Sequence, residues 1–286
     1  MVAKRSEFKK CFFGLKTQHA TPVIKGDTLY MSDLSTLYQN LGLEVEKNYS
    51  QTAIISMTAR VGSTAFVSGL GTCNLSSRPI REIFNPRSSM KDLFERFQPA
   101  SLVHYLNQYN ASNSTEFLVF KTNWIDFSPV ILAVGDDFND VFPEVKFVHI
   151  ERRDKVAQAY SLWKANKFNI WHREKGADYK SPVVEKVPLE IIRQHLSNLH
   201  AEELRWRQYF LEQSIVPHCV YFEEIVEDLS KSVTHAYEFF TGNAPENTPT
   251  SSMYRTSDEH DEIVLSDLRS RLSEGLRPSD DEDTSV

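Results

Sequence analysis

The chain has 286 residues, of which 41% are hydrophobic and 25% charged, a composition typical of a soluble globular protein. It carries 32 Lys and Arg against 39 Asp and Glu, and the formal net charge of −7 disfavours nucleic acid as the main partner. The three cysteines are scattered, no apolar run is long enough to span a bilayer, and the start lacks a secretory pattern. We therefore expect a cytoplasmic protein without disulfides, structural zinc or a membrane partner.

Strands and helices are predicted to alternate along most of the chain. Residues 1–50 form an N-terminal extension with one expected helix over 32–47, where leucines come near helical spacing. Apolar and β-branched runs predict strands over 52–58, 116–124, 145–151 and 218–225. Apolar residues three and four apart predict helices over 88–97, 99–110, 152–168, 188–213 and 261–272. This order favours an α/β fold with a mostly parallel central sheet flanked by helices.

We expect one domain over residues 51–265. Residues 241–252 are rich in Pro, Asn, Thr and Ser and are predicted to form a loop. Residues 266–286 contain the end of the last helix and an acidic tail, SDDEDTSV, which favours a solvated segment.

The segment SMTARVGSTAF, residues 56–66, joins a predicted strand to a predicted helix. A helix that starts there presents backbone N–H groups to an anion. The usual nucleotide loop needs two glycines and a Lys-Ser or Lys-Thr pair, whereas this segment has only Gly62, with Arg60 before it. The hydroxyls of Ser63 and Thr64 and the guanidinium of Arg60 suit phosphate or sulfate oxygens. The same pattern also fits a helix capped by Ser63, with Arg60 on the surface.

A second group of polar residues follows the predicted strand 145–151. Arg152 and Arg153 stand at its carboxyl end, where open α/β sheets usually bind ligands, and Ser161 lies two helical turns further on. Asp154 suits the N-terminus of the helix between them. An exposed Arg–Asp pair, with Ser161 only filling space, fits the same letters.

Together, the stretches TARVGSTAFVSGL, REIFNP, VFKTNW and HIERRDKVAQAYSLWKA resemble the bacterial trehalose 2-sulfotransferase-type family. The resemblance is firm over Thr52 to Trp171 and weaker as far as residue 264. It implies a P-loop-like sulfotransferase fold, related to nucleotide kinases. It also implies metal-free transfer of a sulfuryl group from 3'-phosphoadenosine-5'-phosphosulfate to a hydroxyl or amine of a small polar acceptor, a sugar or a specialised metabolite.

The resemblance assigns two groups of residues to this donor. Its 5'-phosphosulfate is expected at the loop residues Arg60, Val61, Gly62, Ser63 and Thr64. Val61 stands where the family has a serine, so one hydroxyl is missing and backbone N–H groups must supply that contact. The 3'-phosphate is expected at Arg152 and Ser161 with help from Arg153. A C-terminal loop with Arg255 and Ser257 is expected to cover the nucleotide, although its charge-rich sequence fits a solvated loop equally well.

The resemblance also suggests catalytic and acceptor residues. Glu82 in REIFNP is the expected general base, which would take the proton of the acceptor, while Arg60 stabilises charge on the departing phosphate. Without the resemblance, Glu82 would be interpreted as an ordinary exposed carboxylate. The acceptor is expected near Arg78, Lys121, Trp124, Trp171 and His172. Lys121 either touches the sulfuryl oxygens or pairs with a carboxylate.

Arg78 marks a departure from the family pattern. Trehalose-sulfating members carry Gly-Glu-Pro near this point, whereas this chain reads SSRPIRE, with a cation before the proline and an apparent one-residue insertion. This substitution argues against trehalose as the acceptor. Two other functions stay open, a small-molecule kinase with an atypical phosphate loop and a non-catalytic nucleotide-binding protein of the same fold. Whether the chain forms a homo-oligomer is also open.

Overall fold

The computed structural model describes residues 37–87, 89–111, 113, 115–171, 182, 184, 187–253 and 259–274. In chain order its elements are β1 (Gln51–Met57), α3 (Ser63–Thr72), α4 (Ser89–Phe97), α5 (Leu102–Asn110), β2 (Phe117–Asn123), α6 (Trp124–Val134), the short helix η2 (Gly135–Asp137), α7 (Phe138–Val141), β3 (Val145–Glu151), α8 (Lys155–Phe168), α9 (Leu189–Glu212), β4 (His218–Tyr221), α10 (Phe222–Glu227), α11 (Leu229–Thr241) and α12 (Glu259–Glu274).

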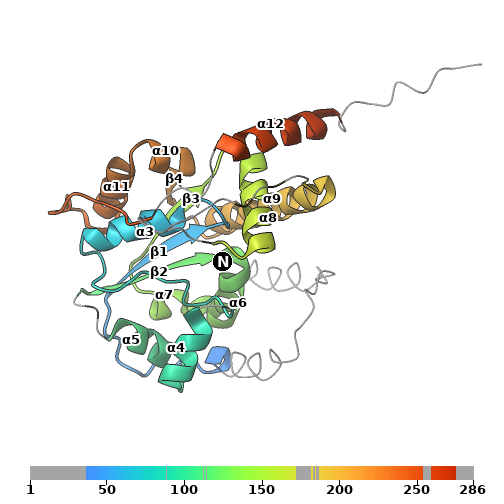
Figure 1. The fold of residues 1–286 in the computed structure, drawn as a ribbon. Coiled ribbons are helices and arrows are strands. Elements are labelled where there is room, and N and C mark those ends of the chain that lie inside the picture. The colour runs from blue at the N-terminus through green and yellow to red at the C-terminus, as the bar shows by residue number, and fades with distance from the viewer. Residues whose placement is uncertain are drawn as a thin grey trace, which may run out of the picture.

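The centre of the fold is a parallel sheet with strand order β2-β1-β3-β4 (Figure 1). Met57 at the end of β1 lies opposite Asn123 of β2 and Ile150 of β3, so these three strands end at the same edge. The chain runs from β1 to β2 and then returns to β3 on the other side of β1. Such a reversal of strand order opens a crevice beyond the carboxyl ends of the strands.

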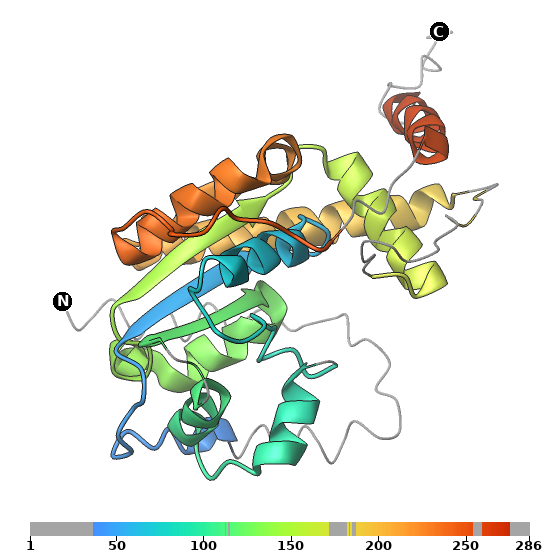
Figure 2. The same cartoon turned by 60° about the vertical axis from the view of Figure 1, so that its left-hand side comes forward.

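Helices cover both faces of the sheet, because side chains alternate between the faces along each strand. On one face, Phe120 and Phe147 pack in an aromatic core with Trp206 of α9 and with side chains of α4 to α7. On the other face, Ile55 and Val148 pack against α3 and α11. Figure 2 shows α3 and α11 on one side of the strands and α5 to α7 on the opposite side.

A third apolar cluster joins α8, α9 and α12 beside the sheet. It contains a buried ion pair, in which Lys164 Nζ lies 2.7 and 2.8 Å from the two carboxylate oxygens of Asp261. The Tyr160 hydroxyl donates a further hydrogen bond of 2.7 Å to Asp261. These contacts fasten α12 to α8, although the two helices are about 100 residues apart in sequence.

The α/β class and the parallel sheet are confirmed, and two of the predicted elements end earlier than expected. Residues 37–39 are helical, but the helix does not continue over 40–47, because Gly42 has φ 66 and its carbonyl accepts from Val45 N–H. The strand predicted over 218–225 ends at Tyr221. There Tyr221 begins a capping box with Glu224 and the chain enters α10. The domain limits at 51 and 265 stay predictions.

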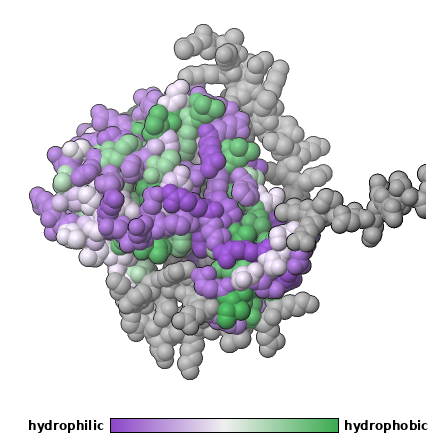
Figure 3. All heavy atoms as spheres, turned by 90° about the horizontal axis from the view of Figure 1, so that it is seen from above, coloured by the Kyte–Doolittle hydropathy of each residue, from purple (hydrophilic) through white to green (hydrophobic). Residues whose placement is uncertain are grey.

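The surface seen from above is mostly hydrophilic, with apolar side chains in separate patches (Figure 3). Among the described residues, no helix combines the length and the hydropathy that crossing a bilayer requires.

Candidate functional site

A cavity of about 1180 Å³ opens at the carboxyl edge of the sheet. Its walls come from the turn after β1 and the start of α3, from α8, from α10 and from residues 249–253. Its lining includes the polar and aromatic residues that could contact a ligand: Arg60, Gly62, Ser63, Thr64, Glu82, Asn85, Lys121, Arg152, Ser161, Trp171 and Phe222. The cavity therefore brings together segments that lie more than 160 residues apart.

The turn after β1 is held in an unusual backbone shape. Arg60 and Gly62 both have positive φ angles, 67 and 75, and Gly62 is the N-cap of α3 without a side-chain hydrogen bond. Ser63 is thus the first residue of the helix and not its cap, unlike the alternative drawn from the sequence. Val61 is fully buried in the core, so its side chain offers nothing to the cavity.

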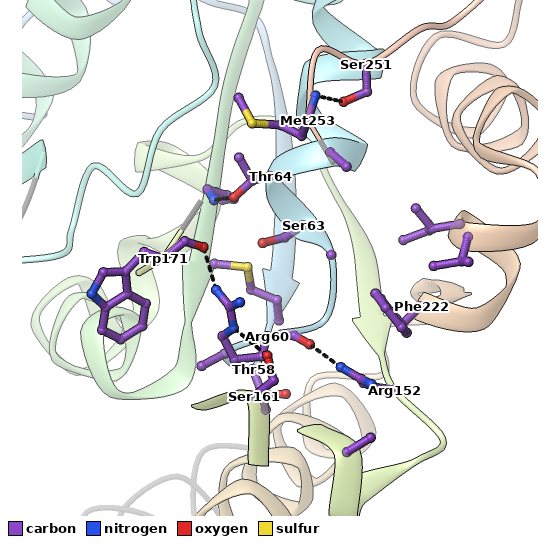
Figure 4. Close-up of a pocket in the computed structure, with 18 of the residues that line it drawn as sticks. Thr58, Arg60, Ser63, Thr64, Arg152, Ser161, Trp171, Phe222, Ser251 and Met253 are labelled. Carbon is purple, nitrogen blue, oxygen red and sulfur yellow. Dashed lines mark hydrogen bonds between the residues drawn. The ribbon is translucent and has the colours of Figure 1, made fainter. Parts of the chain in front are cut away.

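Arg60 is half-buried and is anchored across the cavity by two hydrogen bonds. Its Nε donates to Ser161 Oγ at 3.0 Å, and its Nη1 donates to the carbonyl of Trp171 at 2.5 Å (Figure 4). The two segments singled out in the sequence therefore meet, because a side chain of the first bonds a hydroxyl of the second. Trp171 as a whole is 40% exposed.

Arg152 lies on the other side of the same turn. Its guanidinium is stacked 4.2 Å from the centre of the Phe222 ring, and Nη1 donates to the Arg60 carbonyl at 3.4 Å. Figure 4 shows Arg60 and Arg152 flanking the turn that leads to Ser63. Two guanidinium groups and the N-terminus of α3 make this part of the cavity suited to anions.

The carboxylate before Arg152 is neutralised elsewhere. Glu151 accepts two hydrogen bonds from Arg207 Nη2, at 2.9 and 3.0 Å, and its Oε1 lies 3.3 Å from His149 Nε2. The close approach of His149 and the charge of Arg207 lower the pKa of Glu151 to about 2, against the effect of burial. Glu151 therefore does not compete with a bound anion for Arg152.

Arg153 faces away from the cavity. Its side chain donates to Glu224 at 2.6 Å and stacks on Tyr221, and its backbone N–H donates to Glu223. It thus connects β3 to α10, and its position does not support the predicted help to a 3'-phosphate.

The predicted base, Glu82, belongs to a compact polar group on the opposite wall. Lys121 Nζ lies 3.1 Å from Glu82 Oε1 and 3.2 Å from Thr64 Oγ1. Asn85 Nδ2 donates to Glu82 Oε2 at 2.8 Å. Lys121 therefore does pair with a carboxylate, and the same ammonium also reaches the first turn of α3.

A second carboxyl group lies behind Glu82. Burial raises the pKa of Asp126 to about 7, a hydrogen bond from Asn123 opposes this rise, and the charge of Glu82 adds to it. Asn123 accepts from the Asp126 N–H at 2.8 Å and so caps α6 at the edge of the cavity.

Two of the predicted acceptor residues lie away from the cavity. Trp124 is 4% exposed and packs edge-on against Trp206 in the aromatic core. Arg78 does not line the cavity, and its Nη1 donates to the Tyr109 carbonyl at 3.5 Å. Three other predicted residues, His172, Arg255 and Ser257, lie outside the described residues.

Sequence reasoning missed several residues that shape the site. Gln158 is completely buried and donates to Thr58 Oγ1 at 2.8 Å and to the Ala59 carbonyl at 2.7 Å, which holds the turn after β1. Phe222 and Asp261 also line the cavity. Gln158 lies on the side of the helix opposite Val156, Tyr160 and Trp163, so the apolar spacing offers no signal for its burial.

A sequence model of the family described as Stf0 sulphotransferase matches residues 112–264, more than half of the chain. The chain belongs to the Stf0 sulfotransferase family. The family that the sequence motifs indicated is thus confirmed.

Two curated relatives are named trehalose 2-sulfotransferase. The protein from Mycolicibacterium smegmatis is 28% identical over 136 residues, which cover 45% of this chain and 48% of the relative. The protein from Mycobacterium tuberculosis is 28% identical over 118 residues, covering 41% of this chain and 42% of the relative. Each match thus spans less than half of the relative. The Stf0 match contains Lys121, Arg152 and Ser161 and begins after Arg60 and Glu82.

Proposed function

We propose that this Stf0 family member transfers a sulfuryl group from 3'-phosphoadenosine-5'-phosphosulfate to a hydroxyl or amine of a small polar acceptor. One observation carries the proposal. A single cavity joins an anion-binding turn at the start of α3, two arginines and a carboxylate, Glu82, that faces the same helix start. Family membership supports sulfuryl transfer, and the donor and acceptor are inferred from the chemistry of the cavity.

The side chains of the cavity fit the proposed donor. A nucleotide with phosphates at two points of its ribose needs two separate groups of donors. The N-terminus of α3 and Arg60 suit the 5'-phosphosulfate, and Arg152 with Ser161 suits the 3'-phosphate. Phe222, Ile225 and Leu229 add an apolar wall for the base. Pockets for small ligands measure about 300–1,000 Å³, so about 1180 Å³ leaves room for an acceptor beside the nucleotide.

The residues of the chain then have distinct tasks. The bound donor supplies the sulfuryl group. Glu82 accepts the proton of the acceptor hydroxyl or amine as its oxygen or nitrogen bonds to sulfur. Arg60 and the backbone N–H groups of Ser63 and Thr64 stabilise the charge that grows on the phosphate as the sulfur–oxygen bond breaks. Trp171 and Asn85 border the space in front of Glu82 and bind the acceptor.

The donor assignment is tested by nucleotide binding with a matched pair of variants. Isothermal titration with adenosine 3',5'-bisphosphate should show binding to the wild type without a metal, and ATP with magnesium should bind far more weakly. Arg152→Lys should weaken bisphosphate binding about tenfold, because an ammonium group replaces the planar guanidinium, which can donate two parallel hydrogen bonds to a phosphate. Arg153→Lys, one residue further and outside the cavity, should leave it unchanged. Stronger binding of ATP with magnesium would favour a kinase instead.

The activity is tested with sulfur-labelled donor and a panel of acceptors. The panel includes trehalose, other sugars and small amines, and the labelled product is identified by mass spectrometry. Transfer to any small acceptor supports the proposal. Tight bisphosphate binding without transfer to any member of a broad panel would favour a nucleotide-binding protein that lacks the reaction.

A further inference from the structure

The cavity carries more positive than negative charge. Among the described residues of its lining, the cations are Arg60, Arg87, Lys121, Arg152 and Lys164, and the carboxylates are Glu82 and Asp261. Each carboxylate has a lysine as its ion-pair partner, Lys121 for Glu82 and Lys164 for Asp261. The net positive charge of this lining is therefore that of three arginines. Two of them, Arg60 and Arg152, suit the two ends of the proposed donor, and Arg87 has no part in that assignment.

Arg87 belongs to the same turn as the proposed base. Asn85 connects the two residues, because its Nδ2 donates to Glu82 Oε2 at 2.8 Å and its Oδ1 accepts from the Arg87 N–H at 3.0 Å. The Asn85 N–H also donates to the Glu82 carbonyl at 3.0 Å. These bonds fix the turn, so that the carboxylate and the arginine are presented together to one cavity.

The charge of Arg87 lies on the Glu82 side of the cavity. Its guanidinium is exposed and makes no hydrogen bond or ion pair with any residue that the structure describes. Burial raises the pKa of Asp126, which lies behind Glu82, and the charge of Arg87 opposes this rise. Arg60 and Arg152 flank the turn before α3 on the other wall (Figure 4). Arg87 therefore borders the space assigned to the acceptor.

We propose that the acceptor carries an anionic group, a carboxylate or a phosphate, which Arg87 binds while the acceptor hydroxyl or amine faces Glu82. This assignment rests on the proposed sulfotransferase function and names the class of its acceptor. A guanidinium suits either group, because it donates two parallel hydrogen bonds to a pair of oxygens. The net charge of −7 gives the chain no long-range attraction for an anion, so recognition depends on this local contact.

The anionic group takes no part in the transfer itself. The acceptor oxygen or nitrogen bonds to sulfur, and the bond from sulfur to the 5'-phosphate oxygen breaks with its electron pair on the phosphate. The acceptor proton goes to Glu82. Binding of the anionic group to Arg87 fixes which hydroxyl or amine reaches the sulfur, so Arg87 determines specificity and does not touch the reacting atoms.

Matched acceptors test the proposal with sulfur-labelled donor. Glucose is compared with glucuronate and with glucose 6-phosphate, and tyrosol is compared with hydroxyphenylacetate. An anionic member of a set should have a kcat/KM about tenfold higher than its neutral partner. The carboxylate and phosphate members show which of the two anions the site prefers. The proposal is overturned if the neutral members react equally well or better, or if no anionic member is a substrate.

Variants of two nearby arginines separate a specific contact from a general effect of charge. Arg87→Gln should raise the KM of the anionic acceptor about tenfold and leave the affinity for adenosine 3',5'-bisphosphate unchanged. Arg87→Lys should lose less, because it keeps the charge. Arg81→Gln removes a charge from the same segment outside the cavity lining and should change neither quantity. A loss of bisphosphate affinity in Arg87→Gln would place Arg87 at the donor and overturn the proposal.

The failures of the two proposals are distinguishable. If the wild type does not bind the bisphosphate, or binds it and transfers to no acceptor of a broad panel, the proposed function fails and the acceptor class fails with it. If the wild type transfers to neutral acceptors as well as to anionic ones, only the acceptor class is wrong. A preference for anionic acceptors that Arg87→Gln removes supports both proposals.

Discussion

Gly62 is the residue whose replacement best tests how the anion-binding turn is built. It has φ 75, and a Cβ added there would lie 2.9 Å from Cδ2 of the Phe222 ring. An alanine in this conformation costs about 1–2 kcal/mol of stability. Overpacking against the ring adds about 1–3 kcal/mol. We therefore expect Gly62→Ala to lower the free energy of unfolding by about 2–5 kcal/mol.

The same replacement should also impair nucleotide binding. The Arg152 guanidinium stacks 4.2 Å from the centre of the Phe222 ring. If the ring moves away from the methyl group introduced at position 62, Arg152 is displaced as well. We expect the affinity for adenosine 3',5'-bisphosphate to fall about tenfold. Urea unfolding measures the first effect and isothermal titration the second.

Gly242 provides a matched control for the backbone effect. It has φ 76, and a Cβ there would meet nothing within 4 Å. Gly242→Ala should therefore lose only the backbone contribution of about 1–2 kcal/mol and leave bisphosphate binding unchanged. If Gly62→Ala binds the bisphosphate as tightly as the wild type does, or if the two variants lose equal stability, the Phe222 ring does not support the turn in this way.

Three further variants test other parts of the structure. Glu82→Gln should keep bisphosphate binding and lower turnover by about 10²–10⁴, and unchanged turnover would remove Glu82 as the base. Asp261→Asn removes the carboxylate that pairs with the buried Lys164 ammonium. The free energy of unfolding, measured in urea, should fall by about 3 kcal/mol. A loss below about 1 kcal/mol would contradict this role. Burial raises the pKa of Glu202 to about 7 from 4.5, so its ionisation makes the fold less stable as the pH rises through this range. Glu202→Gln, which still accepts from Trp124 N–H, should be the more stable protein at pH 8 by an amount on the order of 1–3 kcal/mol. The difference should vanish near pH 4, and equal urea midpoints at pH 8 would count against the shift.

The fold class could be predicted because the pattern of apolar residues in short segments distinguishes strands from helices. The strands at 51–57, 117–123 and 145–151 are apolar runs buried on both faces, and the helices between them carry apolar residues three and four apart. The helix expected over 32–47 does not continue past residue 39, because the chain turns at Gly42 and the spacing of leucines carries no information about the φ angle of that glycine. The first part of α10 is predicted as strand, because its short run of apolar residues fits a strand and a helix equally well.

The site could be predicted only as two separate segments. Arg60 and Arg152 are singled out by their positions after two predicted strands and by the family resemblance, yet the bond between Arg60 and Ser161 depends on how α8 docks. Trp124 was misjudged because an aromatic residue at a strand end fits an acceptor pocket and a core equally well. Its burial against Trp206 depends on α9, about 80 residues later in the chain.

The contacts around Arg60 turn these two segments into one unit. A residue other than glycine at φ 67 is strained by about 1–2 kcal/mol, and such strain persists only where the surroundings fix it. Here α8 fixes it through Gln158, which bonds the two residues before Arg60. The residue after β3, Arg152, also fixes it, because it bonds the Arg60 carbonyl. The residues that hold the turn thus come from the segment expected to bind the 3'-phosphate. An anion bound at either group of donors therefore steadies the backbone of the other, so the two halves of a doubly phosphorylated nucleotide should bind with positive coupling.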